Sequence, residues 1–195
     1  MFAGRDITGR RPDQIAGAGL VRTFQLARGI TRLSVLDNLL LYAQHLPGER
    51  PVNALLAAGR AAERQALERA WAIAERLNLA AVANNPAGAL SGGQKKLLEI
   101  GRALMAQPRL ILLDEPIAGV NPALSAAIAE HLHSLRQDGT SFLVIEHHMD
   151  LIARLCDPVI VMAAGARLTE GSFAEVAANP AVQDAYMGQR HRAAC

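Results

Sequence analysis

Three short apolar runs in the second half of the chain most constrain its fold. They are Leu110–Leu113, Phe142–Ile145 and Val159–Met162. Helical patterns over residues 123–137 and 147–156 separate them. Apolar strands that alternate with helices are typical of a parallel sheet covered by helices on both faces. This half of the chain is therefore expected to form an α/β fold.

The first half of the chain has a different, helical pattern. Residues 60–80 place apolar side chains at helical spacing and charged ones between them, which predicts an amphipathic helix. Residues 34–46 predict a second helix, in which Ser34 and Asp37 form a capping box. A short strand is expected near 21–24. The apolar face of the longer helix is expected to contain Leu67, Ala70, Trp71, Ala74 and Leu77.

Composition excludes several classes of protein. A chain of 195 residues with 51% hydrophobic residues can bury a sizeable core. A net charge of +2 is too small to indicate a nucleic-acid partner. Cys156 and Cys195 form no CxxC motif, which indicates free thiols in a reducing compartment. With neither an apolar run long enough to span a membrane nor the apolar core of a signal peptide, we expect a cytoplasmic chain.

Two acidic residues follow the first apolar run. Asp114 and Glu115 come directly after the expected buried strand. Ligands of open α/β sheets bind at the carboxyl ends of the strands. Asp114 is thus a candidate Mg²⁺ ligand, and Glu115 is a candidate to orient or deprotonate an attacking water. A lone acidic pair is more often a solvated loop, but this strand and the following Pro116 favour the functional interpretation.

Polar residues also follow two other expected strands. His147 and His148 come after the second apolar run and are candidates to contact a phosphate or a water. Gln25 follows the first strand, and its amide oxygen is a candidate ligand for Mg²⁺ or water. Taken alone, each of these residues is as easily a polar cap or an ordinary loop residue.

A serine and two glycines precede a helical pattern over residues 93–106. Ser91 is a candidate N-cap, and Gly92 and Gly93 would allow the backbone to approach a phosphate closely. The unpaired N–H groups at a helix N-terminus form an anion site. An ordinary capped helix is the alternative.

The usual phosphate cradle of a mononucleotide-binding α/β domain is G-x-x-x-x-G-K-[ST]. The 195 residues contain only two lysines, Lys95 and Lys96, and neither follows a glycine. This cradle is therefore absent from the printed sequence.

Together these stretches resemble the ATP-binding subunits of ABC transporters. The resemblance lies in the signature LSGGQ at 90–94, the Walker B segment LILLDE at 110–115, the Q-loop Gln25, the D-loop AGVNP at 118–122 and the switch His147. A narrower resemblance is to the subunits that serve branched-chain amino acid uptake, the Liv type. It rests on VRTFQ at 21–25, IEHHMD at 145–150, LCDPVIVM at 155–162 and NPAVQDAYMG at 179–188.

The resemblance implies a partial P-loop NTPase (RecA-like) parallel sheet with an inserted all-helical subdomain. Residues 1–30 and 91–195 would belong to the core, and residues 31–90 to the helical subdomain. It also implies ATP and Mg²⁺ as cofactors. The partners would be transmembrane permease subunits and a second ATP-binding subunit, of different sequence, in a head-to-tail dimer. The chain would then lie peripherally on the inner face of the plasma membrane.

In such a dimer each nucleotide lies between two subunits. The resemblance implies that one group of residues contacts the γ-phosphate of a nucleotide held by the partner. These residues are Ser91, Gly92, Gly93 and Gln94. It implies that a second group acts on the chain's own nucleotide. In this group Asp114 and Gln25 would be Mg²⁺ ligands, and Glu115 and His147 would be catalytic residues.

The absence of the Walker A segment affects these expectations. Only 24 residues precede Gln25, so either Met1 is an internal start of a longer gene product or the chain is truncated at its N-terminus. The 195 residues alone are expected to neither bind ATP tightly nor hydrolyse it. The loss of a strand and a helix is expected to expose an apolar sheet face. Two functions stay open: an ATP-driven import component, and a non-catalytic half-domain that completes a partner's ATP site through LSGGQ. The Liv-like segments and the lack of coiled-coil heptads argue against a nucleic-acid repair ATPase.

Overall fold

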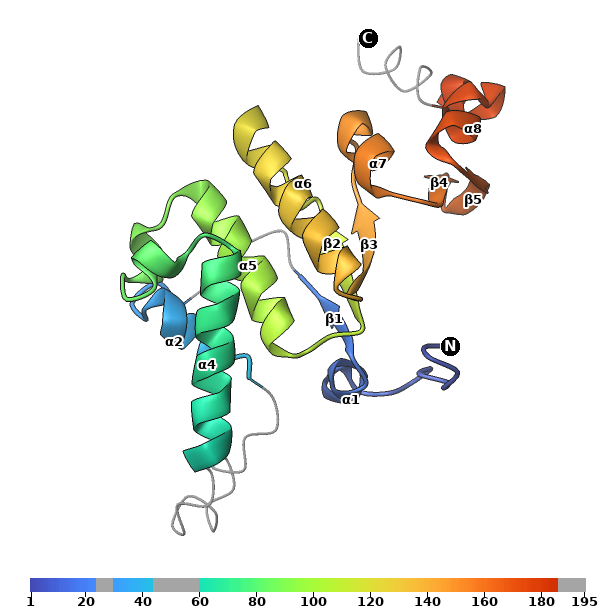
Figure 1. The fold of residues 1–195 in the computed structure, drawn as a ribbon. Helices are drawn as coiled ribbons and strands as arrows, with labels where there is room; N and C mark the ends of the chain where they lie inside the picture. Colours follow the sequence, from blue (N-terminus) through green and yellow to red (C-terminus); the bar gives the residue numbers. More distant parts are fainter. Residues whose placement is uncertain (24–29, 44–59, 186–195) are drawn as a thin grey trace. The chain divides into compact units, whose positions relative to one another are not determined.

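The computed structural model describes residues 1–23, 30–43 and 60–185. The chain divides into two compact units, 1–145 and 146–195, and each is described by itself (Figure 1). In the part of the chain that is described, no helix combines the length and apolarity needed to cross a membrane. The predicted site residue Gln25 lies outside the described residues.

A three-stranded parallel sheet forms the centre of the first unit. Its strand order is β1 (Leu20–Arg22), β2 (Leu110–Asp114) and β3 (Ser141–Ile145). Since β2 is the middle strand, its last residue, Asp114, lies at the carboxyl edge of the sheet and pairs in register with Ile145. The parallel pairing confirms the α/β prediction for these strands.

The two faces of this sheet are covered differently. Ile111 and Leu113 of β2 point to one face and are fully buried. Leu143 of β3 pairs with Leu112 and therefore lies on the other face. There, Leu143 and Ile145 are 50% and 59% exposed. The expectation that helices cover both faces fails at β3, whereas the expected exposed apolar surface is present.

The third apolar run does not join this sheet. In the second unit, β4 (Val159–Ala163) pairs antiparallel with β5 (Ala166–Gly171), so the prediction of a parallel strand here is wrong in this structure. The hairpin arises from its turn: Ala164 and Gly165 both have positive φ, +49° and +79°, as a two-residue type I′ turn requires. The second unit also contains α7 (Met149–Leu155) and α8 (Phe173–Ala178).

Three helices pack together in the first unit: α2 (Val35–Leu40), α4 (Arg60–Arg76) and α5 (Gly92–Met105) (Figure 1). They come close together at Gly101 of α5. A Cβ atom there would lie 2.9–3.2 Å from side-chain atoms of Leu39, Leu77 and Ile73. The remaining elements are α1 (Pro12–Gly17), η2 (Ala80–Val82), η3 (Ala87–Ala89) and α6 (Pro122–Gln137).

The structure confirms the predicted cap at Ser34, and it differs from the prediction in where the helices end and in one residue of the buried face of α4. The Ser34 hydroxyl accepts a hydrogen bond from the Asp37 N–H at 3.0 Å, so the predicted capping box is present. However, α2 ends at Leu40 and α4 at Arg76, earlier than predicted. Leu67 is 40% exposed. Ala70, Ala74 and, just beyond the helix, Leu77 are buried as predicted, and Ala66 and Ile73 are buried beside them.

A buried polar pair links α2 to α5. The Asn38 amide nitrogen lies 2.8–3.2 Å from the carbonyl oxygens of Ile30, Leu33 and Ser34. Its Oδ1 accepts a hydrogen bond of 2.6 Å from Arg102. Both side chains are buried, and burial lowers the pKa of the Arg102 guanidinium. The pair thus holds a buried positive charge between two helices.

The first prediction concerns this pair. We expect Asn38→Ala to lower the free energy of unfolding by about 2–4 kcal/mol, because a charge-assisted hydrogen bond is lost and buried polar groups lose their partner. Urea denaturation of the full chain measures this. Asn84→Ala, which changes an exposed asparagine, is the matched control and should have little effect. Equal stability of the two variants would contradict the assignment.

The second prediction concerns the open face of β3. We expect Leu143→Lys to reduce self-association of the purified chain, since the exposed apolar surface drives contact between molecules. Light scattering coupled to size-exclusion chromatography measures the monomer fraction. Leu67→Lys is the control, because it adds the same charge to an exposed leucine on α4. A chain that is wholly monomeric before any substitution would refute the prediction.

Candidate functional site

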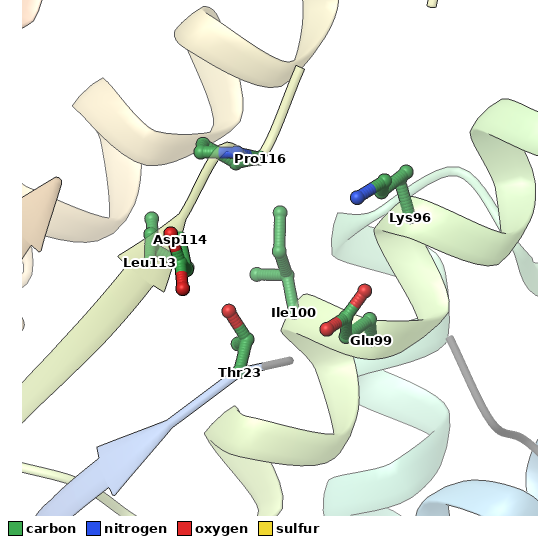
Figure 2. Close-up of a pocket in the computed structure, with 7 residues that line it drawn as sticks. All are labelled: Thr23, Lys96, Glu99, Ile100, Leu113, Asp114 and Pro116. Carbon is green, nitrogen blue, oxygen red and sulfur yellow. The ribbon is translucent and has the colours of Figure 1, made fainter. Parts of the chain in front are cut away.

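A small hollow lies where β1 and β2 end beside α5 (Figure 2). It is open to solvent, and about 210 Å³ of space lies among its lining atoms, part of it open solvent. Its walls leave room for about one water-sized group, so this hollow suits a water or an ion. Its lining residues are Thr23, Lys96, Glu99, Ile100, Leu113, Asp114 and Pro116.

Asp114 carries the carboxylate at the end of β2. Its Oδ2 accepts a hydrogen bond of 3.0 Å from Arg22 of the neighbouring strand, and the side chain is mostly buried. Figure 2 shows Thr23 on the same side of the hollow as Asp114, with Glu99 across from them on α5. Carboxylate and hydroxyl oxygens are hard donors of the kind that Mg²⁺ prefers. The residues that line the hollow therefore fit a magnesium ion.

Glu115, the next residue, has an unusual backbone conformation. Its φ is +48°, in the left-handed region that residues other than glycine rarely adopt. Its N–H donates to the Ile145 carbonyl oxygen at 2.9 Å, which ties this turn to β3. Such a conformation costs about 1–3 kcal/mol and is found most often at functional sites. The strain supports, but does not test, the predicted catalytic role of Glu115.

The N-terminus of α5 has the predicted cap. Ser91 is the N-cap, and its Oγ accepts a hydrogen bond of 3.2 Å from the Gln94 N–H. The Gln94 Oε1 accepts one of 3.0 Å from the Ser91 N–H in return. Ser91 and Gln94, two of the four residues predicted to contact a phosphate, are therefore also hydrogen-bonded to each other. The hydroxyl hydrogen of Ser91 and the amide nitrogen of Gln94 take no part in this capping box.

The two glycines of this helix start have different surroundings. Gly92 is exposed, and a Cβ atom there would meet nothing within 4 Å. Gly93 is buried, and a Cβ atom there would lie 1.9 Å from Cδ2 of Leu124 on α6. The absence of a side chain at Gly93 is thus required by helix packing. Gly92 is the position at which a ligand can approach the backbone.

The start of α6 is fixed in a similar way. The Asn121 side chain accepts a hydrogen bond of 2.9 Å from the Leu124 N–H and caps the helix. Asn121 belongs to the segment that resembles a D-loop. Because Leu124 also contacts Gly93, the D-loop segment and the LSGGQ segment are held against each other.

His147 lies in the second unit, just after β3 ends. Its side chain is exposed, and its backbone N–H donates to Glu146 at 3.1 Å. The other half of the predicted catalytic pair, Glu115, belongs to the first unit. The predicted roles of His147 and of Gln25 therefore stay predictions.

Lys96 and Glu99 line the hollow but were not singled out from the sequence as site residues. They lie three residues apart on α5, with Ile100 next to Glu99. Residues at i, i+3 and i+4 share one face of a helix. This spacing in the sequence indicates that Lys96, Glu99 and Ile100 lie on the same face of α5.

Comparisons with known proteins identify the family. The sequence profile described as ABC transporter matches residues 1–118. A second profile, branched-chain amino acid ATP-binding cassette transporter, matches residues 166–192. A probable branched-chain amino acid transport ATP-binding protein LivG of Archaeoglobus fulgidus is 40% identical over 187 residues, which cover 96% of this chain and 72% of that protein.

The chain belongs to the ABC transporter family of ATP-binding proteins. A second relative of this ATP-binding protein is the high-affinity branched-chain amino acid transport ATP-binding protein BraF of Pseudomonas aeruginosa. It is 38% identical over 194 residues, which cover 95% of this chain and 74% of BraF. These matches confirm the resemblance on which the site residues were predicted.

The fold of this ABC family member agrees with solved structures. The crystal structure of an ATP-binding cassette in its ADP conformation aligns with a TM-score of 0.77 and 38% identity, over 94% of this chain and 74% of that one. A nucleotide-free cassette aligns equally well. The predicted α/β fold with a parallel sheet and helical content is thereby confirmed.

The third prediction uses the two glycines of the LSGGQ segment. We expect Gly93→Ala to lower the free energy of unfolding by about 1–3 kcal/mol, because the added methyl group overpacks the contact with Leu124. Gly92→Ala should cause no loss, since nothing lies close to it. Adding Leu124→Ala to Gly93→Ala should remove most of the overpacking. Urea denaturation measures all four chains, and equal losses at both glycines would contradict the assignment.

Proposed function

We propose that this chain is the ATP-binding component of an ABC transporter that imports branched-chain amino acids. The family membership, the two relatives named for branched-chain amino acid transport and the matching C-terminal profile support this function. The observation that carries it in the structure is the capped start of α5, where Ser91 and the exposed Gly92 form a site that a phosphate can approach.

In this proposal the LSGGQ segment contacts a nucleotide that another subunit holds. Ser91 donates from its hydroxyl, and Gly92 and Gly93 present their N–H groups at the positive end of the helix. Gln94 contributes its amide nitrogen. The partner is a second ATP-binding subunit, of different sequence, in a head-to-tail dimer, and permease subunits span the membrane. The chain lies on the cytoplasmic side of that membrane.

The chain's own nucleotide would lie by the ends of β2 and β3. Asp114 and Gln25 are proposed to hold Mg²⁺, which neutralises charge on the phosphates when it is bound. Glu115 accepts a proton from the attacking water or orients it. His147 is proposed to contact the γ-phosphate or that water.

The alternative function is a non-catalytic half-domain that completes the ATP site of its partner through LSGGQ. The Ser91 cap beside the exposed Gly92 supports this function as well, because it requires only the LSGGQ contact. In both functions Ser91 contacts the partner's nucleotide. They differ in whether Glu115 acts on a nucleotide of this chain.

The fourth prediction tests the phosphate contact. In cells of the source organism that lack the gene, we expect Ser91→Asp to lower saturable leucine uptake at least about fivefold relative to the wild-type chain. Aspartate caps a helix as well as serine does, but its charge repels a phosphate by about 1–4 kcal/mol at 4 Å. Ser91→Asn, a neutral residue that also caps well, is the matched control. Uptake that does not depend on the gene would refute the transport function.

Glu115→Gln separates the two functions in the same uptake assay. If the chain hydrolyses its own nucleotide, the loss of a general base should lower uptake by about 10²–10⁴-fold. If it only completes the partner's site, uptake should stay near the wild-type level while Ser91→Asp still lowers it. Equal effects of Ser91→Asp and Ser91→Asn would show that Ser91 contacts no phosphate.

A further inference from the structure

Three potential metal ligands converge at the start of the second unit. They are the carboxylate of Glu146 and the imidazoles of His147 and His148. One ligand atom from each residue lies within 4.8 Å of the other two. In the described residues this is the one group of three or more such side chains that meets. The proposed ATPase chemistry uses His147 alone from this group.

The spacing is close to that of a metal site. Nδ1 of His148 lies 3.0 Å from Oε2 of Glu146, and Nδ1 of His147 lies 3.9 Å from the same oxygen. Zinc bonds of about 2.0–2.2 Å in a tetrahedral site place neighbouring ligand atoms about 3.3–3.5 Å apart. The observed distances lie on both sides of this value. Both histidine nitrogens therefore lie within about 0.6 Å of the separation from Glu146 that a shared ion requires.

Burial and exposure are also suited to an ion that enters from solvent. The Glu146 side chain is 0% exposed, while those of His147 and His148 are 61% and 47% exposed. A buried carboxylate is stabilised by a cation beside it. The exposed imidazoles leave an open approach and a fourth coordination position for water. Their rings lie 4.3 Å apart and are tilted by 38°, so the two imidazoles are neighbours and are not stacked in parallel.

The donor types select the class of metal. Two imidazole nitrogens with one carboxylate oxygen suit Zn²⁺ and similar transition metals. Mg²⁺ and Ca²⁺ prefer oxygen ligands alone. This set therefore differs from the oxygen donors around Asp114.

We propose that Glu146, His147 and His148 form a binding site for a divalent transition metal, with Zn²⁺ as the best match. An ion bound here occupies a ring nitrogen of His147. It would therefore compete with the phosphate contact proposed for that residue. The metal site itself does not depend on that contact, because its ligands come from this chain alone.

The fifth prediction tests the site directly. We expect the untagged full chain, freed of metal with a chelator, to bind one equivalent of Zn²⁺ with these three ligands in isothermal titration calorimetry without nucleotide. His147→Ala and His148→Ala should each weaken binding at least about tenfold, since even a lost second-shell partner costs about 10–100-fold. His133→Ala is the matched control, because this exposed histidine of α6 bonds to Gln137 and is not one of the three proposed ligands. It should leave the affinity unchanged.

A second measurement excludes a thiol site. Burial and the charge of Glu146 raise the pKa of the Cys156 thiol, so this cysteine is electrostatically close to the cluster. Cys156→Ser should retain Zn²⁺ binding, and bound Co²⁺ should show no thiolate charge-transfer band. Binding that survives both histidine substitutions, or that is lost with Cys156, would overturn the proposal. These outcomes are independent of leucine uptake and so leave the transport function to its own test.

Discussion

The contact between Gly93 and Leu124 determines how the first unit is assembled around α5. It brings the start of α5 against the start of α6, at a distance that no side chain at position 93 would permit. About two turns further along, Gly101 allows α2 and α4 to approach the same helix. Between these two glycines, Lys96 and Glu99 form one wall of the hollow beside Asp114. Two close contacts at either end of one helix thus fix the signature segment and the acidic strand end in a single unit.

Local signals predicted much of this arrangement. The capping box at Ser34 and the N-cap at Ser91 were predicted because each depends only on nearby residues of the chain. The strands of the parallel sheet were predicted because their runs are apolar. The hairpin of β4 and β5 was missed, since β5 has the mixed sequence ARLTEG and the turn depends on a positive φ at Ala164. The buried face predicted around α4 holds for Ala70, Ala74 and Leu77 but not for Leu67, because Ile73 is the residue that meets the neighbouring helix at Gly101.

The site was predictable in type and less so in detail. The rule that ligands bind at the carboxyl ends of parallel strands led to Asp114 and Glu115. The sequence could not show that Gly93 is needed for packing while Gly92 is open to a ligand. The difference depends on Leu124, some thirty residues away. Nor could the sequence show that Glu115 has a left-handed backbone. Both features come from tertiary contacts, which a motif does not specify.

The ion pair between Arg22 and Asp114 bears on how a cation would reach this site. It places a positive group where the proposed Mg²⁺ would bind, so the two are alternatives at the Asp114 carboxylate. The Arg22 side chain is 57% exposed, and solvent-exposed ion pairs contribute about 0–1 kcal/mol to the stability of a protein. A divalent ion has twice the charge and can bind without first breaking a strong interaction. The arginine therefore balances the partly buried carboxylate until a cation arrives, and does not close the site to it.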